Sequence, residues 1–215
     1  MWLSDVYRLS LPFRPMSDFA TSLSPDALAA MQGWLSRAVI GLNLCPFAKA
    51  VQVRGQIRCA VSRATDEEAL LDELAQALQF LQACDRQQCE TTLLVLPTLL
   101  ADFWEFNQFL KRTDRLLRQL GLEGVFQIAS FHPDFEFGDA PAGDMGHFSN
   151  RAPYPTLHLL REDSIEEAMA SFPDAASIYE RNMATLRALG PQGWAALGVG
   201  KDASPIEPAP TGQGA

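Results

Sequence analysis

The sequence Thr91-Thr92-Leu93-Leu94-Val95-Leu96, closed by Pro97, is a continuous run without charged residues. A short run of this kind, with no alternation of polar and apolar positions, is typical of a strand buried on both faces. The run ends at Pro97 because proline cannot donate a hydrogen bond to a neighbouring strand. The sequence therefore predicts a strand over 91–96, and the other elements are placed outward from it.

Further strands and helices flank this strand on both sides. Short runs rich in β-branched and aromatic residues predict strands over 57–62, 124–131 and 156–161. Apolar residues at helical spacing predict helices over about 25–42, 65–81, 101–120 and 174–189, with another opening at 164. The helix-end signals are Ser24 before Pro25, the capping boxes Thr65/Glu68 and Ser164/Glu167, and Gly190-Pro191 after the last helix.

The order of these elements predicts a mixed four-stranded sheet packed with about five helices. Two consecutive strand–helix–strand units should set the first three strands roughly parallel. The fourth strand follows a long loop, 132–155, and should pair antiparallel with the third. The fold class is therefore α/β or α+β, and the sequence pattern does not separate the two.

Composition indicates one compact domain that does not bind polyanions. The chain has 215 residues, of which 47% are hydrophobic and 20% charged, and its net charge is −9. We expect a compact domain over 24–199, an irregular extension over 1–23 and a disordered tail over 200–215. Because so acidic a surface repels phosphate backbones and anionic lipid, we expect neither a nucleic-acid nor a membrane partner.

The first residues and the cysteines favour the cytoplasm. Asp5, Arg8 and Arg14 interrupt the apolar residues of the N-terminus, so no signal-peptide pattern is formed. No run approaches the length of a membrane-spanning helix. In that compartment, the four cysteines are expected to be free thiols.

Two histidines are candidate catalytic residues. His132 ends the third strand and His158 lies inside the fourth. If these strands pair, alternation can bring both imidazoles to the same face at the same end of the sheet. The alternative is that both are structural, with their nitrogens hydrogen-bonded. His147, in the glycine-rich part of the loop, is expected to be solvated.

Asn150 and Arg151 are candidate substrate-binding residues. A guanidinium beside an amide, stiffened by nearby prolines, can clamp a carboxylate or a phosphate. Alternatively, Arg151 pairs with Asp134, Glu136 or Asp139 and holds the loop in place. Glu90 is a further candidate, as a general acid or base, although a solvating charge at the strand end is also a consistent interpretation.

Cys45 is the candidate nucleophile. It follows the first helix, whose negative end disfavours a thiolate, so activation would require a cation such as Arg151 or protonated His132. The alternative is a buried, unreactive thiol packed between Leu44 and Phe47.

Metal and cofactor motifs are missing from the sequence. Cys84 and Cys89 have no second Cys/His pair nearby, so the zinc-ribbon pattern fails. A scattered site from Cys45, His132 and His158 stays geometrically open. No nucleotide-binding or hydrolase motif occurs, and we expect no metal and no cofactor.

Several phrases together resemble the bacterial domain-of-unknown-function family 1415. They are LNLCPFA at 42–48, Glu90-Thr91, QIASFHP at 127–133, Asn150-Arg151, LHLLRE at 157–162, ERN at 180–182 and GPQGW at 190–194. The resemblance covers about residues 28–198. It implies a bacterial protein of about this length, and it supplies no reaction and no cofactor.

Three functions fit these residues. The first is a small-molecule enzyme with a thiol–imidazole–guanidinium pocket at the sheet edge, acting on an anionic metabolite. The second is a non-catalytic module that binds a small anion. The third is a structural or protein-interaction domain whose polar phrases hold loops in place.

Overall fold

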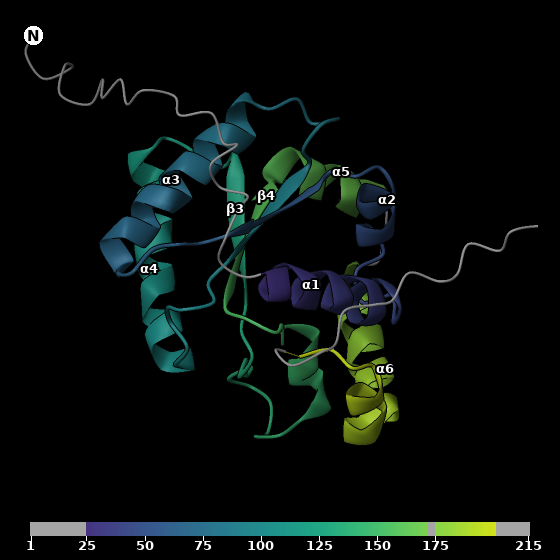
Figure 1. Ribbon diagram of the computed structural model, residues 1–215. Coiled ribbons are helices and arrows are strands. Elements are labelled where there is room, and N and C mark those ends of the chain that lie inside the picture. Colours follow the sequence, from purple (N-terminus) through teal and green to yellow (C-terminus); the bar gives the residue numbers. More distant parts are fainter. Residues whose placement is uncertain (1–24, 172–174, 201–215) are drawn as a thin grey trace, which may run out of the picture.

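The computed structural model describes residues 25–171 and 175–200, which form an α+β domain around one four-stranded mixed sheet (Figure 1). The strands are β1 (Ile57–Val61), β2 (Thr91–Val95), β3 (Phe126–Phe131) and β4 (Thr156–Arg161). The extension expected over 1–23, the cap Ser24 and the tail from 201 onward lie outside the described residues. No helix in the described ranges has the length and apolar character needed to span a membrane.

The strand order is β1-β2-β4-β3. The predicted antiparallel pairing of β3 with β4 is confirmed. The predicted set of three parallel strands is wrong, because β4 lies between β2 and β3 and leaves β1–β2 as the one parallel pair of this sheet. Burial explains the order. Leu157 and Leu159 of β4 are fully buried, whereas β3 exposes Gln127, so β4 occupies the centre and β3 the edge.

Two helices cover one face of the sheet. These are α3 (Glu67–Ala83) and α4 (Phe103–Gln119), seen on one side of the strands in Figure 1. Their apolar stripes pack with Leu94, Leu157 and Leu159 in the main core.

The opposite face carries the remaining helices. They are α1 (Pro25–Trp34), α2 (Ala48–Val53), α5 (Glu162–Ser171) and α6 (Ala175–Ala196). A second core forms where Met31 and Trp34 of α1 pack with Leu93 and Val95 of β2.

Helix boundaries differ from the predicted ones in ways that cap chemistry explains. Asp66, rather than Thr65, caps α3 by accepting a hydrogen bond from the Ala69 amide at 2.8 Å. Helix α5 begins directly after β4 at Glu162, two residues before the predicted Ser164 cap. Gly190, with a φ of 65°, kinks α6 where the sequence predicts its end, and helical turns continue to Ala196.

The segment after α1 has unusual backbone geometry. Leu35–Ile40 is a π-helix, closed by the hydrogen bond from the Gly41 amide to the Ser36 carbonyl at 3.0 Å. Asn43 then adopts a φ of 54°, in the left-handed region. π-Helical turns and left-handed residues often occur at functional sites. Both features immediately precede Leu44 and Cys45.

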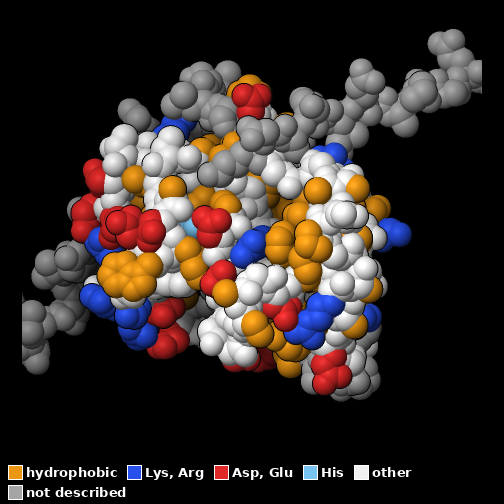
Figure 2. Space-filling model, turned by 90° about the horizontal axis from the view of Figure 1, so that it is seen from below, with side chains coloured by type: hydrophobic (Ala, Val, Ile, Leu, Met, Phe, Trp, Pro, Cys, Tyr) orange, Lys and Arg blue, Asp and Glu red, His pale blue; other side chains and the backbone are white. Residues whose placement is uncertain are grey.

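The long loop between β3 and β4 contains a short 3-10 helix, Met145–Ser149. At the end of the molecule that carries this loop, acidic and basic side chains are interspersed with apolar ones and form no single charged patch (Figure 2).

Candidate functional site

A cavity of about 900 Å³ lies on the sheet face opposite α3 and α4. Its floor is formed by residues of β1 to β4, and its walls by α1, the π-helix, α2 and α5. Most lining side chains are apolar, and a smaller group is charged or hydrogen-bonding. The apolar members include Trp34, Leu35, Val39, Phe131, Ile165 and Ala168.

Strand register orders the cavity from an aromatic end to a charged end. Phe131 is paired with Thr156 at the start of β4, and its ring lies 5.1 Å from that of Trp34. Arg161, at the end of β4, marks the other end of the cavity. Five residues of extended strand separate the two ends, which corresponds to roughly 17 Å. An elongated molecule with one apolar and one polar end matches this gradient.

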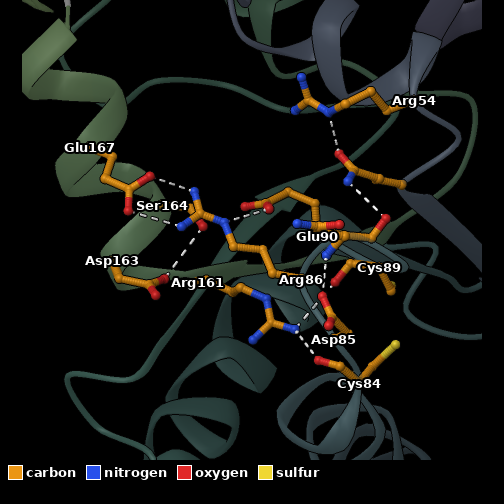
Figure 3. Close-up of polar contacts among 12 residues, drawn as sticks. Arg54, Cys84, Asp85, Arg86, Cys89, Glu90, Arg161, Asp163, Ser164 and Glu167 are labelled. Carbon is orange, nitrogen blue, oxygen red and sulfur yellow. Dashed lines mark hydrogen bonds and ion pairs between the residues drawn. The ribbon is translucent and has the colours of Figure 1, made fainter.

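Arg86 organises the charged end. Its guanidinium bonds Glu90 Oε2 at 2.8 Å and both carboxylate oxygens of Glu167 at 3.0 and 2.7 Å (Figure 3). These bonds raise the pKa of Arg86 and lower the pKa of the Glu167 carboxyl. Arg86 precedes β2 and Glu167 lies on α5, so the ion pairs join two elements across the rim of the cavity.

Two further groups complete this end. Arg54 Nε donates to Gln56 Oε1 at 2.6 Å, and Gln56 Nε2 donates to the Gln87 carbonyl at 2.9 Å (Figure 3). Arg161 Nη2 donates to three backbone carbonyls, those of Leu81, Cys84 and Cys89, at 2.6 to 3.2 Å. Arg161 therefore satisfies carbonyls at the C-terminus of α3.

His158 lies in the floor of the cavity with a defined tautomer. Thr91 Oγ1 donates to the Leu159 carbonyl at 2.6 Å and lies 2.8 Å from His158 Nε2. Because the single hydroxyl proton is used on Leu159, Nε2 must donate, which leaves Nδ1 as an acceptor. Burial lowers the pKa of His158 to about 4, so the imidazole is neutral at pH 7.

Cys45 also lines the cavity. It is partly buried, and it is not paired in a disulfide. Cys59, on β1, and Cys89 are not lining residues; burial raises the pKa of the Cys59 thiol to about 11 and also raises the pKa of Cys89. Cys45 is thus placed where a bound molecule could contact it, unlike the thiols in the two cores.

His132 lies on the opposite face of the sheet from His158, which corrects the expectation of a shared face. The register pairs Ala129 with His158, so His132, three residues on, points to the α4 side. Its Nε2 lies 3.1 Å from the Leu100 carbonyl and its Nδ1 accepts from the Asp134 amide at 3.0 Å. With its side chain fully buried, His132 follows the structural interpretation.

Asn150 and Arg151 lie in the long loop and are not among the cavity-lining residues. Asn150 Nδ2 donates to the Ser130 carbonyl at 3.3 Å. Arg151 Nε donates to the Phe135 carbonyl at 3.1 Å, and its guanidinium lies 3.8 Å from Glu136. These contacts match the alternative in which Arg151 holds the loop, so neither Arg151 nor His132 is placed as the cation for Cys45.

His147 is buried, so the expectation that it is solvated is wrong. Its Nδ1 accepts from the Phe137 amide at 3.1 Å and its Nε2 lies 2.9 Å from the Pro141 carbonyl. The loop folds around this ring, which sequence alone cannot show. The scattered metal site of Cys45, His132 and His158 is not assembled, and the described ranges contain no group of three or more His, Cys, Asp or Glu residues able to hold a metal ion.

The structure therefore gathers three of the candidate residues, Cys45, Glu90 and His158, in one cavity. Sequence reasoning missed Arg86 and Glu167. The spacing of Arg86 and Glu90 by four residues was a usable signal. No local pattern connects either residue with Glu167, 77 positions after Glu90 in the chain.

The fold defines the protein as an α+β domain with a cavity between its sheet and a helical layer. The chain belongs to the family described as protein of unknown function (DUF1415), whose model matches residues 26–196. The searches of curated proteins and of solved structures found no significant match.

Proposed function

We propose that the protein binds a small amphipathic organic molecule in this cavity. Its volume of about 900 Å³ lies within the range of roughly 300–1,000 Å³ typical of small-molecule sites. The apolar part of the ligand would lie against Trp34 and Phe131, and its polar group near Arg86 and Glu90. The cavity, with its ordered change from aromatic to charged lining, is the observation that carries this proposal.

A thiol-dependent reaction on that ligand is the second candidate function. It is favoured by the presence of Cys45 and His158 in the lining of the same cavity. A thiol can serve as a nucleophile, and a neutral imidazole with Nδ1 as an acceptor can orient that thiol through a hydrogen bond. Neither role requires a cofactor or a metal. Free cysteines fit the cytoplasmic location that belongs to this proposal.

Binding of the neutral fluorescent probe N-phenyl-1-naphthylamine tests the cavity. We expect saturable binding with one site per chain in the wild-type protein. Ala168→Trp should reduce it because residue 168 lines the cavity from α5. Ala170→Trp is the matched control, since Ala170 is exposed on the same helix and is not a lining residue. Equal binding by both folded variants, or no saturable binding by the wild type, would contradict the proposal.

A further inference from the structure

Helix α5 covers the charged end of the cavity with little anchoring of its own. None of its ten residues is buried. Ile165, Ala168 and Met169 face the cavity, and Met169 remains 55% exposed. The polar contacts that tie α5 to the body of the domain include the hydrogen bond from the Glu162 amide to the Val125 carbonyl at 3.0 Å, at its first residue, and the two bonds of Glu167 with Arg86 (Figure 3).

Helix α2, in another part of the cavity wall, also has no buried residues. Among its six residues, Val53 is 80% exposed. Ala48 and Val51 line the cavity from this side. Two short helices with apolar residues directed at the cavity and no buried anchor therefore form its walls. Elements with few buried apolar contacts are the ones that move at low free-energy cost.

The two carboxylates on Arg86 are not equivalent. The Glu90 side chain is 12% exposed and belongs to the segment that leads directly into β2, whereas the Glu167 side chain is 65% exposed and belongs to α5. Water screens an exposed ion pair and leaves it only weakly stabilising, so Glu167 can be exchanged for another carboxylate at small cost. Glu90 is the fixed partner of Arg86 and Glu167 the exchangeable one.

The charge of the lining favours an anion. Three arginines (Arg54, Arg86 and Arg161) and two glutamates (Glu90 and Glu167) line the cavity, giving 3 − 2 = +1, in a chain of net charge −9. His158 adds no charge because its pKa is about 4. If Glu167 leaves Arg86, the fixed groups at this end carry a larger positive charge and one guanidinium edge free for a bidentate partner.

We propose that the ligand is an amphipathic monocarboxylate whose carboxylate replaces Glu167 on Arg86. Glu167 is then an internal competitor that occupies the head-group position and closes α5 over the cavity until the acid binds. The apolar chain of the acid extends along β4 toward Trp34 and Phe131. This inference rests on the proposed function, because it assigns a ligand class to the same cavity.

The carboxylate proposal is tested with two competitors, dodecanoate and dodecanol, which differ only in the head group. Each is used at pH 7.5 to displace bound N-phenyl-1-naphthylamine. In the wild type, dodecanoate should displace the probe at a lower concentration than dodecanol. Glu167→Ala should strengthen dodecanoate binding about three- to fivefold, the factor that corresponds to loss of an exposed competing ion pair, and leave dodecanol binding unchanged. Glu166→Ala removes the same charge from an exposed neighbour on α5 and should change neither.

The outcomes separate the two proposals. Failure of the probe to bind would overturn the cavity proposal itself. Probe binding with equal displacement by acid and alcohol in every variant would leave the cavity proposal standing and overturn the carboxylate class. An equal increase in dodecanoate affinity in Glu167→Ala and Glu166→Ala would show a general charge effect. It would overturn the role of Glu167 as the competitor on Arg86.

Discussion

His158 donates a hydrogen bond to Thr91 across the β2–β4 pair, with 2.8 Å between Nε2 and Oγ1. The Thr91 hydroxyl in turn donates a hydrogen bond to the Leu159 carbonyl, so both hydrogen bonds run in the same direction and end on the backbone. This arrangement accommodates a neutral imidazole and leaves Nδ1 directed away from Thr91 as an acceptor. The tautomer of the residue that lies in the cavity floor is therefore set by strand β2.

The same relationship predicts how stability depends on pH. His158 has a pKa of about 4 in the folded protein, whereas an unfolded histidine titrates near pH ~6.5. Between these values the unfolded chain binds a proton that the folded protein does not, so stability falls as pH falls from about 6.5 to 4. The neutral form of His158 contributes at most about 3 kcal/mol to the free energy of unfolding, and this contribution is lost on acidification.

Urea unfolding of the wild type and of His158→Gln, at pH 7.5 and at pH 4.5, checks this prediction. Glutamine keeps a donor for Thr91 and does not titrate. We expect the wild type to lose more free energy of unfolding than the variant on acidification, since the variant lacks the His158 contribution. A difference of zero between the two pH slopes would mean that His158 titrates normally in the folded state.

The π-helix leads to a second prediction. A Cβ atom at Gly41 would overlap the Arg37 carbonyl oxygen of the preceding turn. Because that oxygen belongs to the backbone, relief requires a shift of the π-helix, whose Leu35 and Val39 line the cavity. Gly41→Ala should therefore lower the free energy of unfolding by about 1–3 kcal/mol and weaken probe binding.

Gly138→Ala is the control for this change. A Cβ atom at Gly138 meets nothing within 4 Å, so this substitution should alter the free energy of unfolding by less than about 0.5 kcal/mol. Chemical denaturation gives the stabilities and probe fluorescence gives the affinities. If the two alanine variants behave alike, the π-helix does not constrain residue 41.

The strands could be predicted from local sequence, and their order could not. A short apolar run and β-branching are properties of five or six neighbouring residues, so all four strands lie where the pattern predicts them. The insertion of β4 beside β2 depends on which strand most needs burial on both faces. The burial of Leu157 and Leu159 in β4 must be compared with the exposure of Gln127 in β3, and the long loop separates these strands in the sequence.

For the candidate site too, residue types could be predicted from the sequence and their placement could not. The types of Cys45, Glu90 and His158 identified them as chemically capable, and all three line the cavity. The face of the sheet on which His132 falls depends on register, because a shift of one residue reverses every side chain. Since Ala129 is the partner of His158, His132 falls on the far face.

The last prediction concerns the reactivity of the cysteines, which separates the thiol chemistry from simple binding. Thiolates react with iodoacetamide, so a raised pKa slows labelling at neutral pH. Cys59, whose pKa is about 11, and Cys89, whose pKa is also raised, should label slowly. Cys45 and Cys84 are both partly buried, but Cys45 lines the cavity and Cys84 does not.

We therefore expect dodecanoate to protect Cys45 from labelling and to leave Cys84 unaffected, as read by peptide mass spectrometry. If His158 orients this thiol through Nδ1, His158→Gln should change the labelling rate of Cys45 alone at pH 7.5. Protection of Cys45 without any effect of His158→Gln would favour a binding protein over a thiol enzyme. If dodecanoate changes the labelling of neither Cys45 nor Cys84, Cys45 does not contact the bound acid, although its side chain lines the cavity.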